Sequence, residues 1–268
     1  MENEKYIGVF DSGIGGLTVV KSIVETMPNE NIIYFGDTAH VPYGTRSKRQ
    51  VTEYVLSDVK FLSTFDIKAI VIACNTADSI AREKVEELYD LPVFGVVDPA
   101  SKLAAEATKN GKIGVIATNA TIKSRAYDSA IAKYNARAEV FGVACPLLVP
   151  LVENGRTSKG DVVIETVLKE YLDPLVALGI DTLVLGCTHY PLLFEIIANL
   201  YPEIKIISSS TAAAETLRAS LASRSLLRTS GESTRKYFVS DDADGFTRQA
   251  TLFMGDELGG SIEQVEIE

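Results

Sequence analysis

The sequence predicts an α/β protein made of two similar doubly wound parallel-sheet domains that face each other across a cleft. Three observations support this prediction. Short β-branched runs alternate with amphipathic segments along most of the 268 residues, which is the pattern of βαβ units. The apolar runs are continuous, as expected of strands that are buried on both faces. Similar segments also recur in the same order in the two halves of the chain.

The apolar runs define eight expected strands, four in each half of the chain. They are Tyr6–Phe10, Ile32–Phe35, Ala69–Ala73 and Val93–Val97 in the first half, and Ile113–Ala117, Glu139–Val143, Leu183–Gly186 and Ile204–Ile207 in the second. Helical periodicity is clear in Thr52–Thr64 and Val162–Leu178.

The C-terminal segment extends beyond the second series of strands. It predicts a long helix over Thr211–Leu227, a short strand over Lys236–Val239 and a final helix over Asp244–Met254. Because the chain ends after this segment, we expect it to pack back on the first domain.

The internal repeat has three matching pairs of segments. Ile7–Phe10 (IGVF) is echoed by Ile113–Ile116 (IGVI), and Phe35-Gly36 by Phe141-Gly142. In the third pair, Ile70–Thr76 (IVIACNT) matches Leu183–His189 (LVLGCTH), with a cysteine at the same place in each. Three matches in order predict a duplicated unit whose related residues lie on opposite walls of a cleft. The domains expected are residues 1–97 plus 208–268, and residues 98–207.

Composition narrows the functional classes. With 26 Lys and Arg against 36 Asp and Glu, the net charge of −10 argues against binding to nucleic acid or to an anionic membrane. No apolar run approaches the length of a membrane span, and the acidic N-terminus does not resemble a signal peptide. We therefore expect a cytoplasmic protein. The three cysteines and two histidines show no metal-ligand spacing, so no metal site is predicted.

Cys74 and Cys187 are the strongest candidates for chemistry. Each follows an apolar strand and precedes polar residues and a helical segment, the place where open α/β sheets bind ligands. The following helix is expected to lower the thiol pKa from its usual value of about 8.5. A single such cysteine is more often a core residue, but two at equivalent places of a repeat favour a paired site. Cys145 has no counterpart in the first half; we expect it to be structural, with lining of the cleft as the alternative.

Polar loops at other strand ends supply further candidates. Asp11–Gly16 is a glycine-rich turn that fits neither a dinucleotide fingerprint nor a phosphate-binding loop. Its carboxylate and hydroxyl could orient an ammonium group or a proton-transfer partner. Pro42–Gly44 is a second such loop, for which a scaffold role is equally compatible. His189 lies two residues after Cys187, and Glu153 ends an apolar stretch, where the end of a helix is the simpler explanation.

Taken together, four motifs closely resemble the glutamate racemase family over essentially the whole chain. They are Phe10–Thr18 (FDSGIGGLT), Gly36–Gly44 (GDTAHVPYG), Ala73–Ala77 (ACNTA) and Gly186–Pro191 (GCTHYP). The Asp-Ser-Gly opening, and Cys-Thr-His in place of the Cys-Thr-Glu of aspartate racemases, favour glutamate as the substrate.

The resemblance implies a homodimeric isomerase that works without pyridoxal phosphate or another cofactor. It would supply D-glutamate for peptidoglycan, and so for cell-wall biogenesis and cell shape. The resemblance also implies that the C-terminal segment completes the first domain. One departure is Ser208-Ser209-Ser210, where the family pattern has an aspartate after the strand; it bears only on contacts around the domain junction.

The motif match also assigns roles to residues. Cys74 and Cys187 would be the acid/base pair, and Asp11 and His189 would each assist the proton transfer on one face. The residues that it implies for substrate binding are Asp11, Ser12, Pro42, Tyr43, Gly44, Asn75, Thr76, Glu153, Thr188 and His189.

Two opposed thiols suit racemisation, because inverting an α-carbon without a cofactor needs one base on each face of the substrate. Three alternatives stay open at this point. One is a related racemase that acts on aspartate. Another is a cysteine hydrolase that uses Cys187 with His189, which leaves Cys74 without a role. The third is a non-catalytic protein that binds small anions at helix ends.

Overall fold

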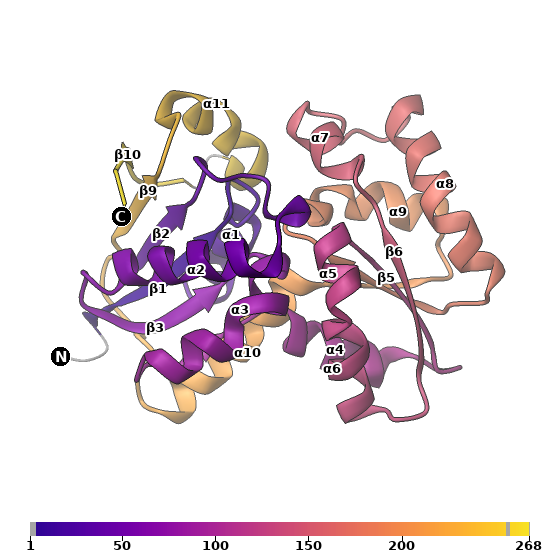
Figure 1. Cartoon of the computed structure of the whole chain (residues 1–268), viewed down its shortest axis with the longest axis horizontal. Coiled ribbons are helices and arrows are strands. Elements are labelled where there is room, and N and C mark those ends of the chain that lie inside the picture. The colour runs from indigo at the N-terminus through magenta and orange to yellow at the C-terminus, as the bar shows by residue number, and fades with distance from the viewer. Residues whose placement is uncertain (1–3, 256–257, 268) are drawn as a thin grey trace.

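The computed structural model describes residues 4–255 and 258–267, and their strands form two separate sheets (Figure 1). The larger sheet has the order β10-β9-β2-β1-β3-β4, and each of its pairings is parallel. Its strands are β1 (Tyr6–Asp11), β2 (Ile32–Gly36), β3 (Ile67–Ile72), β4 (Val93–Phe94), β9 (Arg235–Val239) and β10 (Ile262–Gln264).

The smaller sheet is also parallel, in the order β6-β5-β7-β8. Its strands are β5 (Lys112–Ala117), β6 (Glu139–Ala144), β7 (Thr182–Gly186) and β8 (Lys205–Ser208). Strands β2, β3 and β7 are buried along their whole length, and β1 and β5 are buried except at their first residue, which explains why the sequence shows continuous apolar runs.

Helices cover both faces of the larger sheet. Side chains alternate between the faces of a strand, so Val9 packs in the core formed with α1, α10 and α11, whereas Phe10 packs in the core formed with α2 and α3. These helices are α1 (Leu17–Thr26), α2 (Lys48–Leu62), α3 (Asn75–Leu88), α10 (Ser209–Ser223) and α11 (Ala243–Met254).

The remaining helices belong to the second sheet and to the connection that leads to it. They are α4 (Val97–Ala107), α5 (Asn119–Ser124), α6 (Ala126–Tyr134), α7 (Leu148–Glu153), α8 (Val162–Ala177) and α9 (Phe194–Leu200). Two short 3₁₀ helices, η2 (Tyr43–Thr45) and η3 (Tyr190–Leu193), follow β2 and β7. In Figure 1 the second sheet and its helices form the pink and orange lobe beside the indigo and yellow one.

The structure confirms the predicted fold class and corrects several element boundaries. The expected strand Val93–Val97 is wrong after Phe94, because the N–H groups of Val96 and Val97 bind the Asp78 carboxylate and begin α4. Helix α2 begins at Lys48, earlier than expected, because Ser47 and Gln50 form a capping box.

The C-terminal boundaries are also shifted. Ser208 caps α10, which therefore spans Ser209–Ser223 in place of the expected Thr211–Leu227. Strand β10 was not predicted, because three residues provide too short a pattern to recognise.

The C-terminal segment packs on the first half of the chain, as expected. Strand β9 pairs with β2, and helices α10 and α11 contact α1. The division into residues 1–97 plus 208–268 and residues 98–207 is a proposal, supported by the separation of the two sheets. No helix within the described ranges is long and apolar enough to cross a membrane.

A buried ion pair anchors the part of the C-terminal segment that follows α10. Lys68 Nζ on β3 lies 2.6 Å from Glu30 Oε2, and both side chains are at most 2% exposed. Lys68 also donates to the carbonyl of Leu226 at 2.9 Å, and the Arg228 N–H donates to Glu30 Oε1 at 2.8 Å. The pair therefore joins β3 and the turn before β2 to the chain that follows α10.

We expect Glu30→Gln to lower the free energy of unfolding by about 3–5 kcal/mol, because the buried Lys68 ammonium would lose the Glu30 charge that lies 2.6 Å from it. Urea denaturation measures the loss. The matched control is Glu53→Gln, which removes an exposed pair with Arg49 and should change the free energy of unfolding by less than about 1 kcal/mol. Equal losses in the two variants would contradict a special role for the buried pair.

Candidate active site

A cavity of about 260 Å³ lies where the carboxyl ends of the two sheets meet. Parallel strands bring the loops that follow them to one edge, and here the edges of both sheets contribute. The lining residues are Ser12–Ile14, Val41–Thr45, Cys74–Thr76, Thr118, Asn119, Cys145, Pro146, Val149, Pro150, Glu153 and Cys187–His189.

The structure gathers the predicted site residues in this cavity, with one exception. Asp11 is not among the lining residues; its carboxyl is buried behind the wall. Cys145 is completely buried and lines the cavity, which was the alternative considered for it. Sequence reasoning missed Thr118 and Asn119. The internal repeat could have indicated Thr118, since Thr118 follows Ile113–Ala117 as Ser12 follows Ile7–Asp11.

Cys74 lies at the N-terminus of α3, at the end of the loop after β3. It is 6% exposed, and its Sγ donates to Ser12 Oγ at 3.6 Å. Burial raises the pKa of the Cys74 thiol to about 12, and the negative charge of Asp11 adds to the rise. The N–H groups of Ala77 and Ser12 oppose it. The expected lowering of the Cys74 pKa is therefore wrong, because desolvation outweighs the helix N-terminus.

Cys187 follows β7 on the opposite sheet and is also 6% exposed. Its Sγ lies 3.9 Å from Nδ1 of His189. Burial raises the pKa of Cys187, the His189 N–H opposes this, and the charge of Cys74 contributes to the rise. The expected lowering is thus wrong for this thiol as well. This effect of the Cys74 charge on Cys187 places the two thiols within electrostatic reach of each other.

His189 is held by a carboxylate on its far side. Its Nε2 lies 2.9 Å from Glu153 Oε1, at the end of α7, while its Nδ1 faces Cys187. The ring also meets Phe253 of α11 edge to face, with centroids 5.4 Å apart. These contacts fix the ring with Nδ1 turned toward Cys187.

The Asp11 carboxyl is buried behind the wall of the cavity. Its Oδ2 accepts from the N–H groups of Gly13 and Gly16 at 3.1 and 2.9 Å, and Oδ1 has no hydrogen-bond partner among the described residues. Burial raises the pKa of Asp11, and the opposing effect of His189 comes next in size. The carboxylate thus acts on the thiols by its charge.

Glycines allow the two halves to approach closely. A side chain at Gly15 would collide with Thr188 and His189, and a Cβ at Gly44 would lie 2.9 Å from the Thr118 Cβ. The glycine-rich turns therefore bring loops of the first sheet against loops of the second.

Buried hydroxyl groups bridge the same junction. Thr76 Oγ1 lies 2.9 Å from Thr118 Oγ1, and Thr18 Oγ1 donates to the Thr188 carbonyl at 2.8 Å. The serine run contributes to the junction, because Ser210 Oγ lies 2.9 Å from Thr18 Oγ1 and Ser209 Oγ donates to the Leu185 carbonyl.

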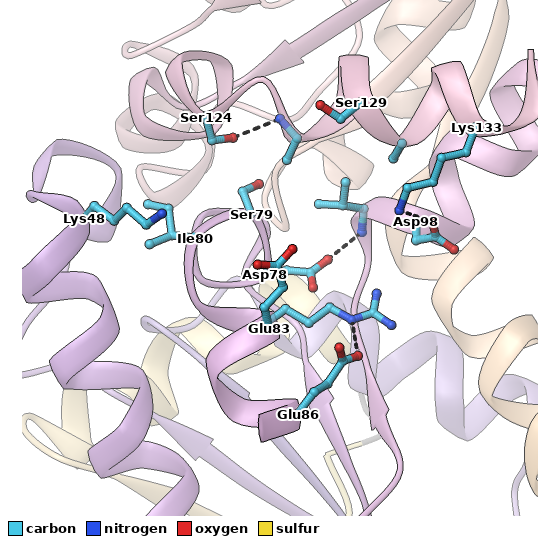
Figure 2. A pocket seen from close by; sticks show the side chains of 14 residues that line it. Lys48, Asp78, Ser79, Ile80, Glu83, Glu86, Asp98, Ser124, Ser129 and Lys133 are labelled. Carbon is cyan, nitrogen blue, oxygen red and sulfur yellow. Dashed lines mark hydrogen bonds and ion pairs between the residues drawn. The ribbon is translucent and has the colours of Figure 1, made fainter. Parts of the chain in front are cut away.

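A second hollow, of about 570 Å³, opens between α3, the start of α4 and α6 (Figure 2). Its charged groups are mostly satisfied by neighbours: Arg82 pairs with Glu86 at 2.8 Å, and Asp78 accepts from the first N–H groups of α4. None of the described residues that line it is a cysteine or histidine. The smaller cavity between the sheets is therefore the candidate active site.

Comparison with known proteins gives consistent matches. The family model for Asp/Glu/hydantoin racemases matches residues 7–217. A glutamate racemase from Geobacter metallireducens is 46% identical over 266 residues, which are 98% of this chain and 97% of that protein. The crystal structure of a glutamate racemase from Bacillus anthracis superposes with a TM-score of 0.94 at 37% identity, covering 98% of both chains. A glutamate racemase from Francisella tularensis, in complex with D-glutamate, gives 0.91 at 39% identity, again covering 98% of both.

We expect the Cys74 thiol of the ligand-free protein to stay protonated well above neutral pH. In the denatured chain, thiolate absorbance should rise around pH 8.5, whereas in the folded protein the contribution of Cys74 should rise only as the pH approaches 12. The contribution is measured as the difference between wild type and Cys74→Ser in an ultraviolet titration. A Cys74 step below about pH 8.5 would show that the helix N-terminus prevails over burial.

Proposed function

The chain belongs to the Asp/Glu/hydantoin racemase family and is an isomerase; we propose that it interconverts L- and D-glutamate with Cys74 and Cys187 as opposed acid/base thiols. The observation that carries the proposal is the placement of one buried thiol from each sheet on a single small cavity. A hydrolase would need one nucleophile and one base, which leaves the second thiol without a role.

Glutamate is the substrate that the comparisons favour. The relatives at 44 to 46% identity over nearly the whole chain are glutamate racemases, and the Francisella tularensis structure contains D-glutamate. A cavity of about 260 Å³ suits a molecule of this size.

In the proposed reaction, one thiolate removes the proton from the α-carbon, and the opposite thiol donates its proton to the other face. The first thiol thereby becomes protonated and the second becomes a thiolate, so the roles are exchanged for the reverse direction. Burial favours the protonated state that the donor needs. It also makes the thiolate a stronger base once it has formed, because water does not solvate the charge.

The base thiol must first lose its proton. Nδ1 of His189 lies 3.9 Å from Cys187 Sγ and is placed to accept it on that face. Cys74 lies in the field of Asp11, whose raised pKa makes this carboxylate a better proton acceptor than an exposed one. The ammonium group of the substrate would favour the thiolate further by its positive charge.

The carbanion that forms between the two steps needs hydrogen-bond donors around its carboxylate. The N-terminus of α3 presents Asn75 and Thr76 to the cavity, and Ser12 and Thr188 add hydroxyl groups from the other loops. Free N–H groups at a helix start bind carboxylates without a further cation. The proposed proton transfers thus use side chains of this chain and no cofactor.

The biological part of the proposal rests on the resemblance to glutamate racemases. The enzyme would act in the cytoplasm as a homodimer, and its D-glutamate would enter peptidoglycan, supporting cell-wall biogenesis and cell shape.

We expect Cys74→Ser and Cys187→Ser each to abolish net racemisation of glutamate with the fold intact, because each face then lacks its acid or base. Circular dichroism with L- or D-glutamate in D₂O, together with mass spectrometry of α-deuteration, measures the loss. Cys145→Ser is the matched control for the loss of a buried thiol and should retain racemisation. Near-normal turnover of either active-site variant in both directions would exclude the two-thiol mechanism.

The two faces should also differ in their assisting residues. His189→Asn should slow the proton transfer at Cys187, and Asp11→Asn the transfer at Cys74. Equilibrium fixes the ratio of the overall kcat/KM values, so the asymmetry is measured as primary isotope effects with α-deuterated L- and D-glutamate. Identical changes for both enantiomers in both variants would indicate a shared binding role.

A further inference from the structure

A cluster of buried acidic groups lies directly behind the loop that forms one wall of the cavity. The Tyr43 hydroxyl is 2.6 Å from Asp37 Oδ2 and 3.0 Å from Asp58 Oδ2. Both carboxyls are 0% exposed, and Tyr43 is 1% exposed. Asp58 belongs to α2, on the face that carries Val51, Val55, Val59 and Leu62 into the core. The proposed proton transfers do not use this aspartate.

The number of protons in this cluster decides its state. Two hydrogen bonds meet at the Tyr43 oxygen, and each needs a proton, whereas the phenol supplies one. The second proton must therefore lie on one of the two carboxyl groups. Two ionised carboxylates on either side of a buried phenol would also repel each other strongly in a dry environment.

The surroundings assign that proton to Asp58. Asp37 has other polar neighbours: Ser240 Oγ donates to its Oδ1 at 2.9 Å, and His40 Nδ1 lies 2.9 Å from both of its oxygens. Asp58 has Tyr43 alone, since its Oδ1 has no hydrogen-bond partner in the described part of the chain. Burial raises the pKa of Asp58 well above its usual range, and the charges of Asp37 and Asp11 raise it further.

We propose that Asp58 is a positioning residue, a neutral carboxylic acid that donates to Tyr43 and thereby holds the loop Pro42–Thr45 against the cavity. Tyr43 in turn donates to the Asp37 carboxylate, so the hydrogen bonds run in one direction from α2 to the loop after β2. A carboxyl in an apolar site can stay neutral at neutral pH and serve as a donor.

The loop transmits this anchoring to the site. Pro42, Tyr43 and Gly44 line the cavity, and Gly44 packs so closely on Thr118 that a Cβ there would lie 2.9 Å from the Thr118 Cβ. A small displacement of the loop would thus disturb the wall on which glutamate is proposed to bind. The kinetic part of this inference therefore rests on the proposed function, whereas the protonation of Asp58 can be measured without it.

Infrared difference spectroscopy tests the protonation state directly. Subtracting the spectrum of Asp58→Asn from that of wild type at neutral pH should reveal the C=O band of a protonated carboxyl. The control is Asp66→Asn, whose side chain is 75% exposed and paired with Lys5; it should reveal the bands of an ionised carboxylate. In Tyr43→Phe the Asp58 band should shift, because its O–H loses its acceptor. Carboxylate bands for Asp58 like those of Asp66 would overturn the proposal.

Kinetics test the positioning role. Asp58→Asn keeps an N–H that can donate to Tyr43, and KM and kcat for glutamate should stay within about threefold of wild type. Asp58→Leu fits the apolar face of α2 and should melt no lower than wild type, yet raise KM about tenfold through the lost hydrogen bond. A wild-type KM in the Leu variant, or equal impairment of both variants, would contradict the role.

Two further comparisons distinguish a failure of the positioning role from a failure of folding or of the proposed function. If Asp58→Leu fails to fold, Tyr43→Phe breaks the same link from the loop side, and it should raise KM with kcat less affected. An unchanged KM in this variant would count against the role. If the wild-type protein does not racemise glutamate, the proposed function fails, and the infrared spectra still decide whether Asp58 is a neutral donor.

Discussion

The proposed reaction depends on one constraint, that two buried thiols, one from each sheet, are held at a single cavity. A thiolate without water is costly to form, and the proposed reaction needs it to form beside the α-carbon of a substrate held within reach of both sulfur atoms. Each thiol therefore comes from a different parallel sheet, at the end of a buried strand, where the backbone is fixed by hydrogen bonds on both sides. The position of one sheet relative to the other then sets the reactive geometry.

That relative position is fixed by small groups. Gly15 and Gly44 bring the loops of the two sheets into contact, and hydroxyl pairs such as Thr76 with Thr118 join them. The serine run Ser208–Ser210 belongs to the same system, because its hydroxyl groups reach Thr18 and the end of β7. These short side chains are closely packed and hydrogen-bonded, so a bulkier residue would push the sheets apart.

Much of the fold could be read from the sequence, because the repeat and the buried strands leave periodic signals. The paired cysteines and their neighbours were predicted for the same reason. The direction of the thiol pKa shifts was not, since it depends on how deeply the other half of the molecule covers each thiol. The place of Asp11 behind the wall, and the core position of Asp58 on α2, likewise depend on packing between segments distant in sequence. Thr118 could have been predicted from the internal repeat, but the segment around it contains no cysteine that would mark it as a candidate site.

The C-terminal strands have a consequence for solubility. Strand β2 reads IIYFG and is completely buried, and β9 is the strand that covers its outer edge. Without β9, this apolar run would present unpaired N–H and C=O groups to other molecules, as a template for intermolecular strand pairing. In the folded chain the strand at this edge of the sheet is β10, which is three residues long and carries the exposed residues Glu263 and Gln264. A short polar strand is a poor template, so the segment that completes the larger sheet also leaves it with an edge that disfavours strand pairing between molecules.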